Sequence, residues 1–198
     1  MTAPADAALA RRGLRLEYLT IAWNVMEGVV AIGSGIAAGS IALVVFGLDS
    51  FIEVAAAGVV VWELRGGAED RERTALRLIA MTLFALAAYV AVSATRDLLL
   101  AERPHESIPG IAIAVASLVV MPLLASAKRR TGQALNSNTL VADSAETLLC
   151  TYLSAILLAG LVLNAAFGWW WADPVAAYGI AILAIREGRE AWRGDTCC

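Results

Sequence analysis

Two pairs of side chains with metal-binding chemistry lie inside long apolar stretches of this sequence. Asp49 and Glu53 are four residues apart, and Glu146 and Cys150 repeat that spacing further along the chain. On a helix, residues four apart lie on one face, one turn from each other. Three carboxylates and a thiol offer the tetrahedral oxygen and sulfur ligands that suit zinc, with cobalt, iron, cadmium or manganese as alternatives. We therefore expect Asp49, Glu53, Glu146 and Cys150 to bind a divalent metal cation.

Further polar residues accompany these pairs. Glu27 and Asp143 also lie in apolar stretches, where an acid at the centre of a membrane helix costs roughly 2.5–3.5 kcal/mol. We expect no Lys or Arg at the same depth, so each acid must be protonated, hydrated or bound to a cation. Asp143, Glu27 and Asn24 are expected to support the ligands or to relay protons. The alternatives are that Asp143 faces the membrane interface, that Glu27 is hydrogen-bonded within the bundle, and that Cys150 is a small buried hydrophobe.

The composition places these residues in a membrane protein. The chain has 198 residues, of which 60% are hydrophobic and only 17% charged, against about a quarter charged in soluble domains. The mean hydropathy of +0.71 agrees with a lipid environment. A net charge of -3 indicates no nucleic-acid partner, and the three cysteines form no disulfide framework.

Six apolar stretches are expected to be transmembrane helices, because each approaches the length of about 20 residues that crosses a bilayer. The expected spans are approximately 17–38, 41–63, 77–99, 108–127, 138–167 and 171–188. The fold class is therefore all-α, a polytopic membrane protein whose residues 1–198 form a single transmembrane domain. We expect no separate soluble domain.

Basic residues alternate between the ends of these stretches. Arg11, Arg65, Lys128 and Arg186 belong to sets at one side of the membrane, whereas the other side carries only Arg96 and Arg103. Basic residues favour the cytoplasmic side, so both termini are expected there, with 128–136 forming a basic loop. We expect a multi-pass protein of the bacterial inner membrane.

A short internal echo relates the second stretch to the fifth. Residues 40–53 align with 137–150, so that Asp49 falls on Glu146 and Glu53 on Cys150. Three helices per half give the halves opposite topology, a 3+3 inverted-repeat-like arrangement with a site between them near the midplane. The site is thus expected between the second and fifth helices.

At these residues the sequence resembles the cation diffusion facilitator family of metal exporters. The motif of the family's second helix reads here as Ser40, Ala42, Leu43, Asp49, Ser50 and Glu53, and that of its fifth helix as Ala142, Asp143, Glu146, Thr147 and Cys150. The resemblance implies six membrane helices and a homodimer that exchanges a cytoplasmic divalent metal for protons by alternating access. The sequence departs from the family's usual pattern in two ways. The family's fifth helix normally carries His or Asp followed by Asp, and this chain would be a minimal member without the family's C-terminal cytoplasmic domain.

The function expected from these patterns is proton-coupled efflux of zinc or a similar transition metal. The partners would be the lipid bilayer, the divalent cation as substrate, protons and a second copy of the chain. The alternative is a metal sensor or accessory subunit of the membrane that binds metal without net flux. We expect no enzyme activity and no organic cofactor, because the sequence has no nucleophile elbow, phosphate-binding loop or histidine-rich catalytic pattern.

Overall fold

The computed structural model describes residues 3–38, 41–66, 69–100, 107–167, 169 and 171–193. The described chain forms six helices: α1 (Ala3–Ala38), α2 (Ile41–Gly66), α3 (Glu69–Leu100), α4 (Ile108–Leu135), α5 (Asn138–Phe167) and α6 (Ala172–Arg193). The all-α class is confirmed, and each expected span lies within one helix, apart from Trp171 just before α6. Arg103, Ser40, Cys197 and Cys198 lie outside the described residues.

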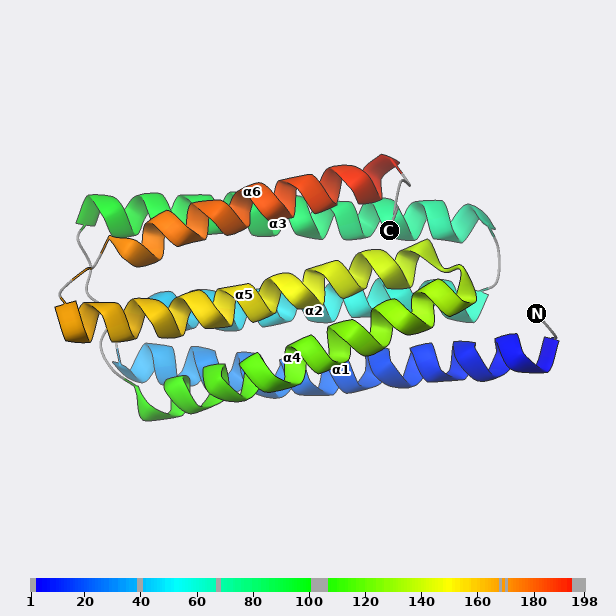
Figure 1. The fold of residues 1–198 in the computed structure, drawn as a ribbon, viewed down its shortest axis with the longest axis horizontal. Coiled ribbons are helices and arrows are strands. Elements are labelled where there is room, and N and C mark those ends of the chain that lie inside the picture. Colours follow the sequence, from blue (N-terminus) through cyan, green and yellow to red (C-terminus); the bar gives the residue numbers. More distant parts are fainter. Residues whose placement is uncertain are drawn as a thin grey trace.

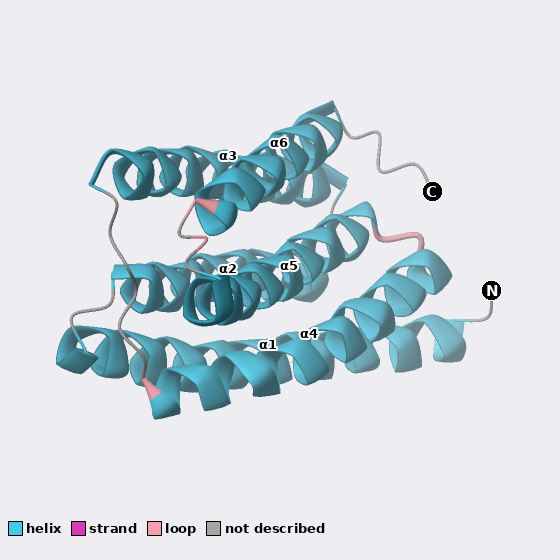
Figure 2. Ribbon diagram, turned by 60° about the vertical axis from the view of Figure 1, so that its left-hand side comes forward, coloured by secondary structure: helices cyan, strands magenta, loops and turns pink. Residues whose placement is uncertain are grey.

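The helices pack as three layers of two. α3 pairs with α6, α2 lies beside α5, and α1 lies beside α4, with the α2/α5 layer between the other two (Figures 1 and 2). Contacts of α1 with α2 and of α4 with α5 join the lower layers, and contacts of α2 with α3 and of α5 with α6 join the upper ones. Side chains of α2 and α5 are therefore covered on two faces, which is where the expected site residues lie.

Each layer combines one helix from the first half of the chain with its counterpart from the second half. Figure 1 shows α1 and α4 side by side and running in opposite directions. This pairing is the one that two inverted three-helix repeats would produce.

Four helices in the described part of the chain are long and apolar enough to cross a membrane. They contain the segments Ala7–Ala37, Arg73–Leu100, Ile108–Leu135 and Asn138–Ala159. Within the described residues, α2 and α6 are not among these four; α2 carries Asp49, Glu53 and Glu63, and the last two turns of α6 are charged. The helices agree with a membrane protein, while the number of spans stays a prediction.

The basic segment after the fourth apolar stretch is helical, so the expected loop at 128–136 is wrong. Ser107 caps the N-terminus of α4, its Oγ accepting a hydrogen bond from the Gly110 amide at 3.4 Å, and the helix continues to Leu135. Asn136 then takes a left-handed conformation (φ 54°), and the Ser137 amide donates to the Gly132 carbonyl at 2.9 Å. Only this tight turn separates α4 from α5, and Lys128 therefore lies on a helix.

Glycines let α1 and α2 approach each other at backbone distance. A Cβ atom on Gly28 would lie 3.0 Å from the Gly47 carbonyl oxygen, and one on Gly47 would lie 2.9 Å from the Gly28 carbonyl oxygen. A Cβ atom on Gly35 would meet the Val44 amide at 2.8 Å. These contacts fix α2 against α1 and set the position of Asp49, two residues after Gly47.

Candidate metal site

The interior between α1, α2, α4 and α5 is polar. On α1, the buried face carries Glu17, Thr20, Asn24 and Glu27, spaced by three and four residues. Asp49, Ser50 and Glu53 of α2, Ser117 and Lys128 of α4, and Asp143, Glu146, Thr147 and Ser154 of α5 are buried as well. The cluster on the α3 and α6 side, by contrast, consists of apolar residues such as Ile79, Leu83, Leu86, Ile180 and Ala184. Most of the buried polar side chains of the described residues therefore lie on the α1, α2, α4 and α5 side.

Three of the four expected ligands are neighbours in this interior. Asp49 and Glu53 are 3% and 2% exposed, and both face α5, where their carboxyl groups interact with the Cys150 thiol. Glu53 also interacts with Thr147, one turn earlier on α5. The i, i+4 spacing thus presents both carboxyls of α2 to the same stretch of α5.

These carboxyls lack the partners that buried acids normally have. Oδ2 of Asp49 and both side-chain oxygens of Glu53 have no hydrogen-bond partner among the described residues. Neither carboxyl forms a salt bridge with a described basic side chain. Buried polar atoms are nearly always paired, so unpaired buried acids require a proton, water or a cation.

The fourth expected ligand, Glu146, faces a different helix. Its Oε2 accepts a hydrogen bond from Thr82 Oγ1 of α3 at 3.3 Å, and its Oε1 has no hydrogen-bond partner in the part of the chain that the structure describes. Glu146 is close enough to Asp49 and Glu53 for the charges to interact. The structure therefore places it beside the cluster, held by α3 rather than turned toward Cys150.

Glu27 and Asn24 extend the cluster along α1. Glu27 is fully buried beside Ser117 of α4 and Trp23, and neither of its carboxyl oxygens has a hydrogen-bond partner among the described residues. Asn24 Nδ2 donates to the Thr20 carbonyl at 3.0 Å, whereas its Oδ1 finds no hydrogen-bond donor within the described ranges. Their expected roles in supporting ligands or relaying protons stay predictions.

The side chains surround one region without forming a finished chelate. Among the described residues, no three His, Cys, Asp or Glu side chains converge on a point that could hold a metal ion. Binding in this region therefore requires at least one side chain to turn, and Glu146 Oε1 is one of the unpaired buried oxygens that α5 offers.

The expectation that no basic residue lies at the depth of the acids is wrong for Lys128. Its side chain is 0% exposed, and its Nζ lies 2.5 Å from Asp143 Oδ2 and 3.1 Å from Glu17 Oε2. Nζ also donates to Thr147 Oγ1 at 3.1 Å. Asp143 is thus paired with an internal cation and fully buried, not exposed at an interface.

Glu17 and Lys128 were missed by the sequence analysis, although both leave a signal. Glu17 continues the three-and-four spacing of Thr20, Asn24 and Glu27 on one face of α1. Lys128 continues the buried stripe of α4 that includes Ser117, Met121 and Ala125. Both residues lie close to arginines, at 11, 12, 15, 129 and 130, and such arginines are typical of the membrane–water interface.

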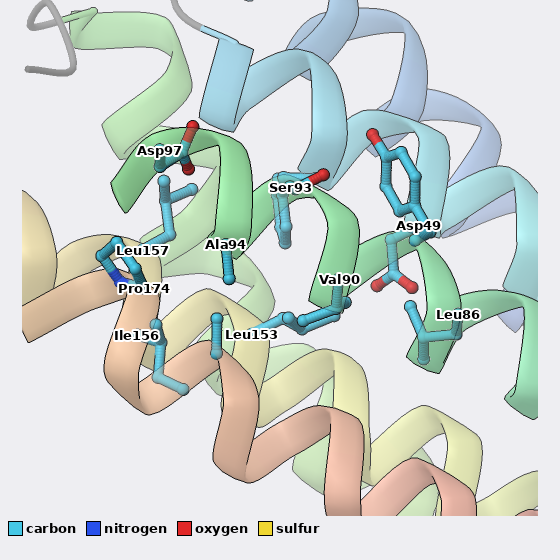
Figure 3. A pocket seen from close by; sticks show the side chains of 13 residues that line it. Asp49, Leu86, Val90, Ser93, Ala94, Asp97, Leu153, Ile156, Leu157 and Pro174 are labelled. Carbon is cyan, nitrogen blue, oxygen red and sulfur yellow. The ribbon is translucent and has the colours of Figure 1, made fainter. Parts of the chain in front are cut away.

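A narrow cavity of about 60 Å³ connects Asp49 with one end of the bundle. Its walls come from α2, α3, α5 and α6, and are apolar except for Asp49 and a stripe of α3 residues at Tyr89, Ser93 and Asp97. Figure 3 shows Asp49, Ser93 and Asp97 following one another along this cavity. The three α3 residues are half-buried, whereas Asp49 is buried.

Comparison with known proteins gives related sequences. The family model described as the cation efflux transmembrane domain matches residues 18–193. A Synechocystis sp. protein named as an uncharacterized transporter is 28% identical over 198 residues, covering 94% of this chain and 59% of that protein. The cation-efflux pump FieF of Shewanella oneidensis is 32% identical over 83 residues, covering 42% of this chain and 27% of that protein. The chain thus spans less than two thirds of the length of either relative.

Proposed function

Because this chain belongs to the cation efflux transmembrane domain family, we propose that it carries a divalent metal cation across a membrane. The resemblance expected from the helix motifs is confirmed, and the chain is an integral membrane protein of that family. We propose zinc as the substrate, with cobalt, iron, cadmium or manganese as alternatives. Cys150 favours transition metals over calcium or magnesium, which prefer oxygen ligands.

One observation carries this proposal: Asp49 and Glu53 face Cys150 in a buried interior without a salt bridge or enough hydrogen bonds among the described residues. A structural role would supply a fixed partner, as Lys128 does for Asp143. A cation that arrives and leaves would bind where the partner is missing. The Shewanella relative, a cation-efflux pump, supports the same proposal.

Binding would be completed by Glu146. In the proposed bound state its carboxyl leaves Thr82 and turns toward Cys150, which gives three carboxylates and a thiol around the ion. Metal ligation requires deprotonated carboxylates and thiolate, so binding would release protons, and proton-coupled exchange follows. Glu27 and Asn24, on the facing helix, would accept protons or position water.

The cavity beside α3 supports a route from Asp49 to one side of the membrane. A volume of about 60 Å³ is enough for a short file of water molecules, since each needs roughly 10–15 Å³ of such space, but is too narrow for a hydrated divalent ion. The excess of basic residues at the other end of the bundle places the Asp97 end outside in this proposal. Release of the metal would then require α3 to move away from α2.

The remaining parts of the proposal come from the resemblance and from the charge pattern. They are efflux from the cytoplasm, six spans with both termini cytoplasmic, a homodimer and residence in the bacterial inner membrane. We also propose that the chain has no enzymatic activity and no organic cofactor, because the polar interior offers ligands for an ion and no paired nucleophile and base.

Zinc flux into proteoliposomes across an imposed pH gradient tests the proposal. We expect wild-type flux to depend on the gradient and the double variant Asp49→Asn, Glu53→Gln to lose it. Glu190→Gln, which alters an exposed acid on α6, is the matched control and should retain flux. Zinc binding without flux in the wild type would instead identify a sensor or accessory subunit. Unchanged flux in the double variant would refute the site.

A further inference from the structure

The Lys128 ammonium group occupies a position with the features of a cation site. Three oxygens surround Nζ: Asp143 Oδ2 at 2.5 Å, Glu17 Oε2 at 3.1 Å and Thr147 Oγ1 at 3.1 Å. They come from α1 and α5, while Lys128 itself comes from α4. Carboxylate and hydroxyl oxygens are the donors that hard divalent cations take in proteins.

The same carboxyls retain unused capacity. Asp143 Oδ1 and Glu17 Oε1 are buried and have no hydrogen-bond partner among the described residues, and both side chains are 0% exposed. Glu17 and Asp143, when both are ionised, carry two negative charges, of which the ammonium group cancels one. A divalent cation in place of the ammonium group would cancel both. The donors and the charge therefore exceed what one lysine needs.

We propose that Lys128 fills, with its own ammonium group, a divalent-cation site made by Glu17, Asp143 and Thr147. The interior then has two cation positions, and one of them is occupied by a group that cannot leave. This inference does not depend on the proposed transport function. Its corollary, that Lys128 limits the protein to a single exchangeable ion, does rest on that function.

The ammonium group of a lysine is covalently attached to the chain, whereas a metal ion can dissociate. The Lys128 ammonium group cannot dissociate from the chain, it pairs with both Asp143 and Glu17, and it joins α1, α4 and α5 at one end of the bundle. Asp143 is one turn from Thr147, which also interacts with Glu53. Without the lysine, a second ion would bind beside the first, and the number of ions held by the chain would change.

The test is the number of manganese ions bound per chain by the full-length protein in detergent. Manganese is the probe because the proposed site has only oxygen donors. Equilibrium dialysis followed by elemental analysis should show that Lys128→Ala binds one more ion than the wild type. Arg129→Ala, which removes an exposed positive charge from the next position of α4, should show no gain.

A second variant separates the site from the loss of charge. Lys128→Ala combined with Asp143→Asn removes a ligand as well as the lysine, and should return manganese binding to the wild-type number. If Lys128→Ala folds poorly, its recovery and its melting temperature should increase with manganese, and those of the double variant should not. Either gain supports the proposal.

Failure of this inference and failure of the transport function give different results. A Lys128→Ala variant with no additional ion and no manganese-dependent recovery refutes the site at Lys128, whatever the wild type binds. A wild type that binds no ion refutes the proposed function, while an increase from none to one in Lys128→Ala would still establish the site at Lys128.

Discussion

Two carboxylate clusters lie next to each other in the bundle interior, and only one of them has a cation of its own. Asp143 and Glu17 are joined to Lys128, whereas no basic side chain of the described residues forms a salt bridge with Asp49 or Glu53, near Cys150. We refer to them as the lysine cluster and the open cluster. α5 contributes to both, and Thr147 interacts with each.

The difference separates buried acids that have a structural role from buried acids that are available to a transported ion. An acid with a fixed partner ties helices together, and an acid without one leaves the interior short of positive charge. Burial is nearly equal in the two clusters, so burial alone does not reveal function. The distinguishing feature is whether the protein supplies the compensating charge.

The largest effect is expected at the lysine cluster. Lys128→Met keeps most of the side-chain volume but leaves Glu17 and Asp143 uncompensated, so the free energy of unfolding should fall by about 3–5 kcal/mol. Denaturation in detergent micelles, followed by circular dichroism, measures this change. A loss below about 1 kcal/mol would show that the ion pairs contribute little and that the two clusters are alike.

The open cluster should respond to metal instead. Zinc at a free concentration of 100 times its dissociation constant should stabilise the wild type by about 2.7 kcal/mol. The double variant Asp49→Asn, Glu53→Gln should show no such gain, and without metal it should be at least as stable as the wild type, because neutral amides are less costly to bury. Thermal melts with and without zinc provide the comparison, and equal zinc stabilisation of both proteins would contradict it.

The thiol should determine the metal preference of the open cluster. Cys150→Ser replaces a soft ligand by a hard one, so the affinity for zinc relative to manganese should fall by about tenfold or more. Competition dialysis with both metals measures the ratio. Ser154→Ala, one turn further along α5, is the control, and an unchanged ratio in Cys150→Ser would remove the thiol from the site.

The smallest effect concerns the hydrogen bond that holds Glu146 on α3. If Glu146 must leave Thr82 to join the ion, then Thr82→Val removes a competing bond worth about 0.5–1 kcal/mol and zinc affinity should increase. Titration calorimetry detects a change of this size. An unchanged affinity, together with full binding by Glu146→Gln, would place Glu146 outside the bound state.

The sequence predicts the helices well because the apolar runs are long. The six helices and the facing of Asp49 and Glu53 toward α5 follow from hydrophobic length and from four-residue spacing. Both signals are local to one helix, and neither depends on the neighbours. The end of α4 was mispredicted because three consecutive basic residues, Lys128 to Arg130, are typical of a loop at the membrane edge.

What the sequence could not predict depends on contacts between helices. Burial of Lys128 is favourable only because α1 and α5 bring Glu17 and Asp143 to it, and neither spacing nor composition reveals that meeting. The orientation of Glu146 is likewise decided by Thr82 on α3. Both outcomes are set by tertiary contacts across the layers of the bundle.

The glycine contact between α1 and α2 restricts how the interior can open. At Gly28 and Gly47 the two backbones meet directly, and the side chains of Phe51 and Ile32 pack against these glycines, so α1 and α2 have little room to slide past each other. They act mechanically as one arm that carries Asp49 and Glu53 with it. We therefore expect the rearrangement that admits or releases an ion to occur where α3 and α6 pack through apolar side chains against the layer of α2 and α5.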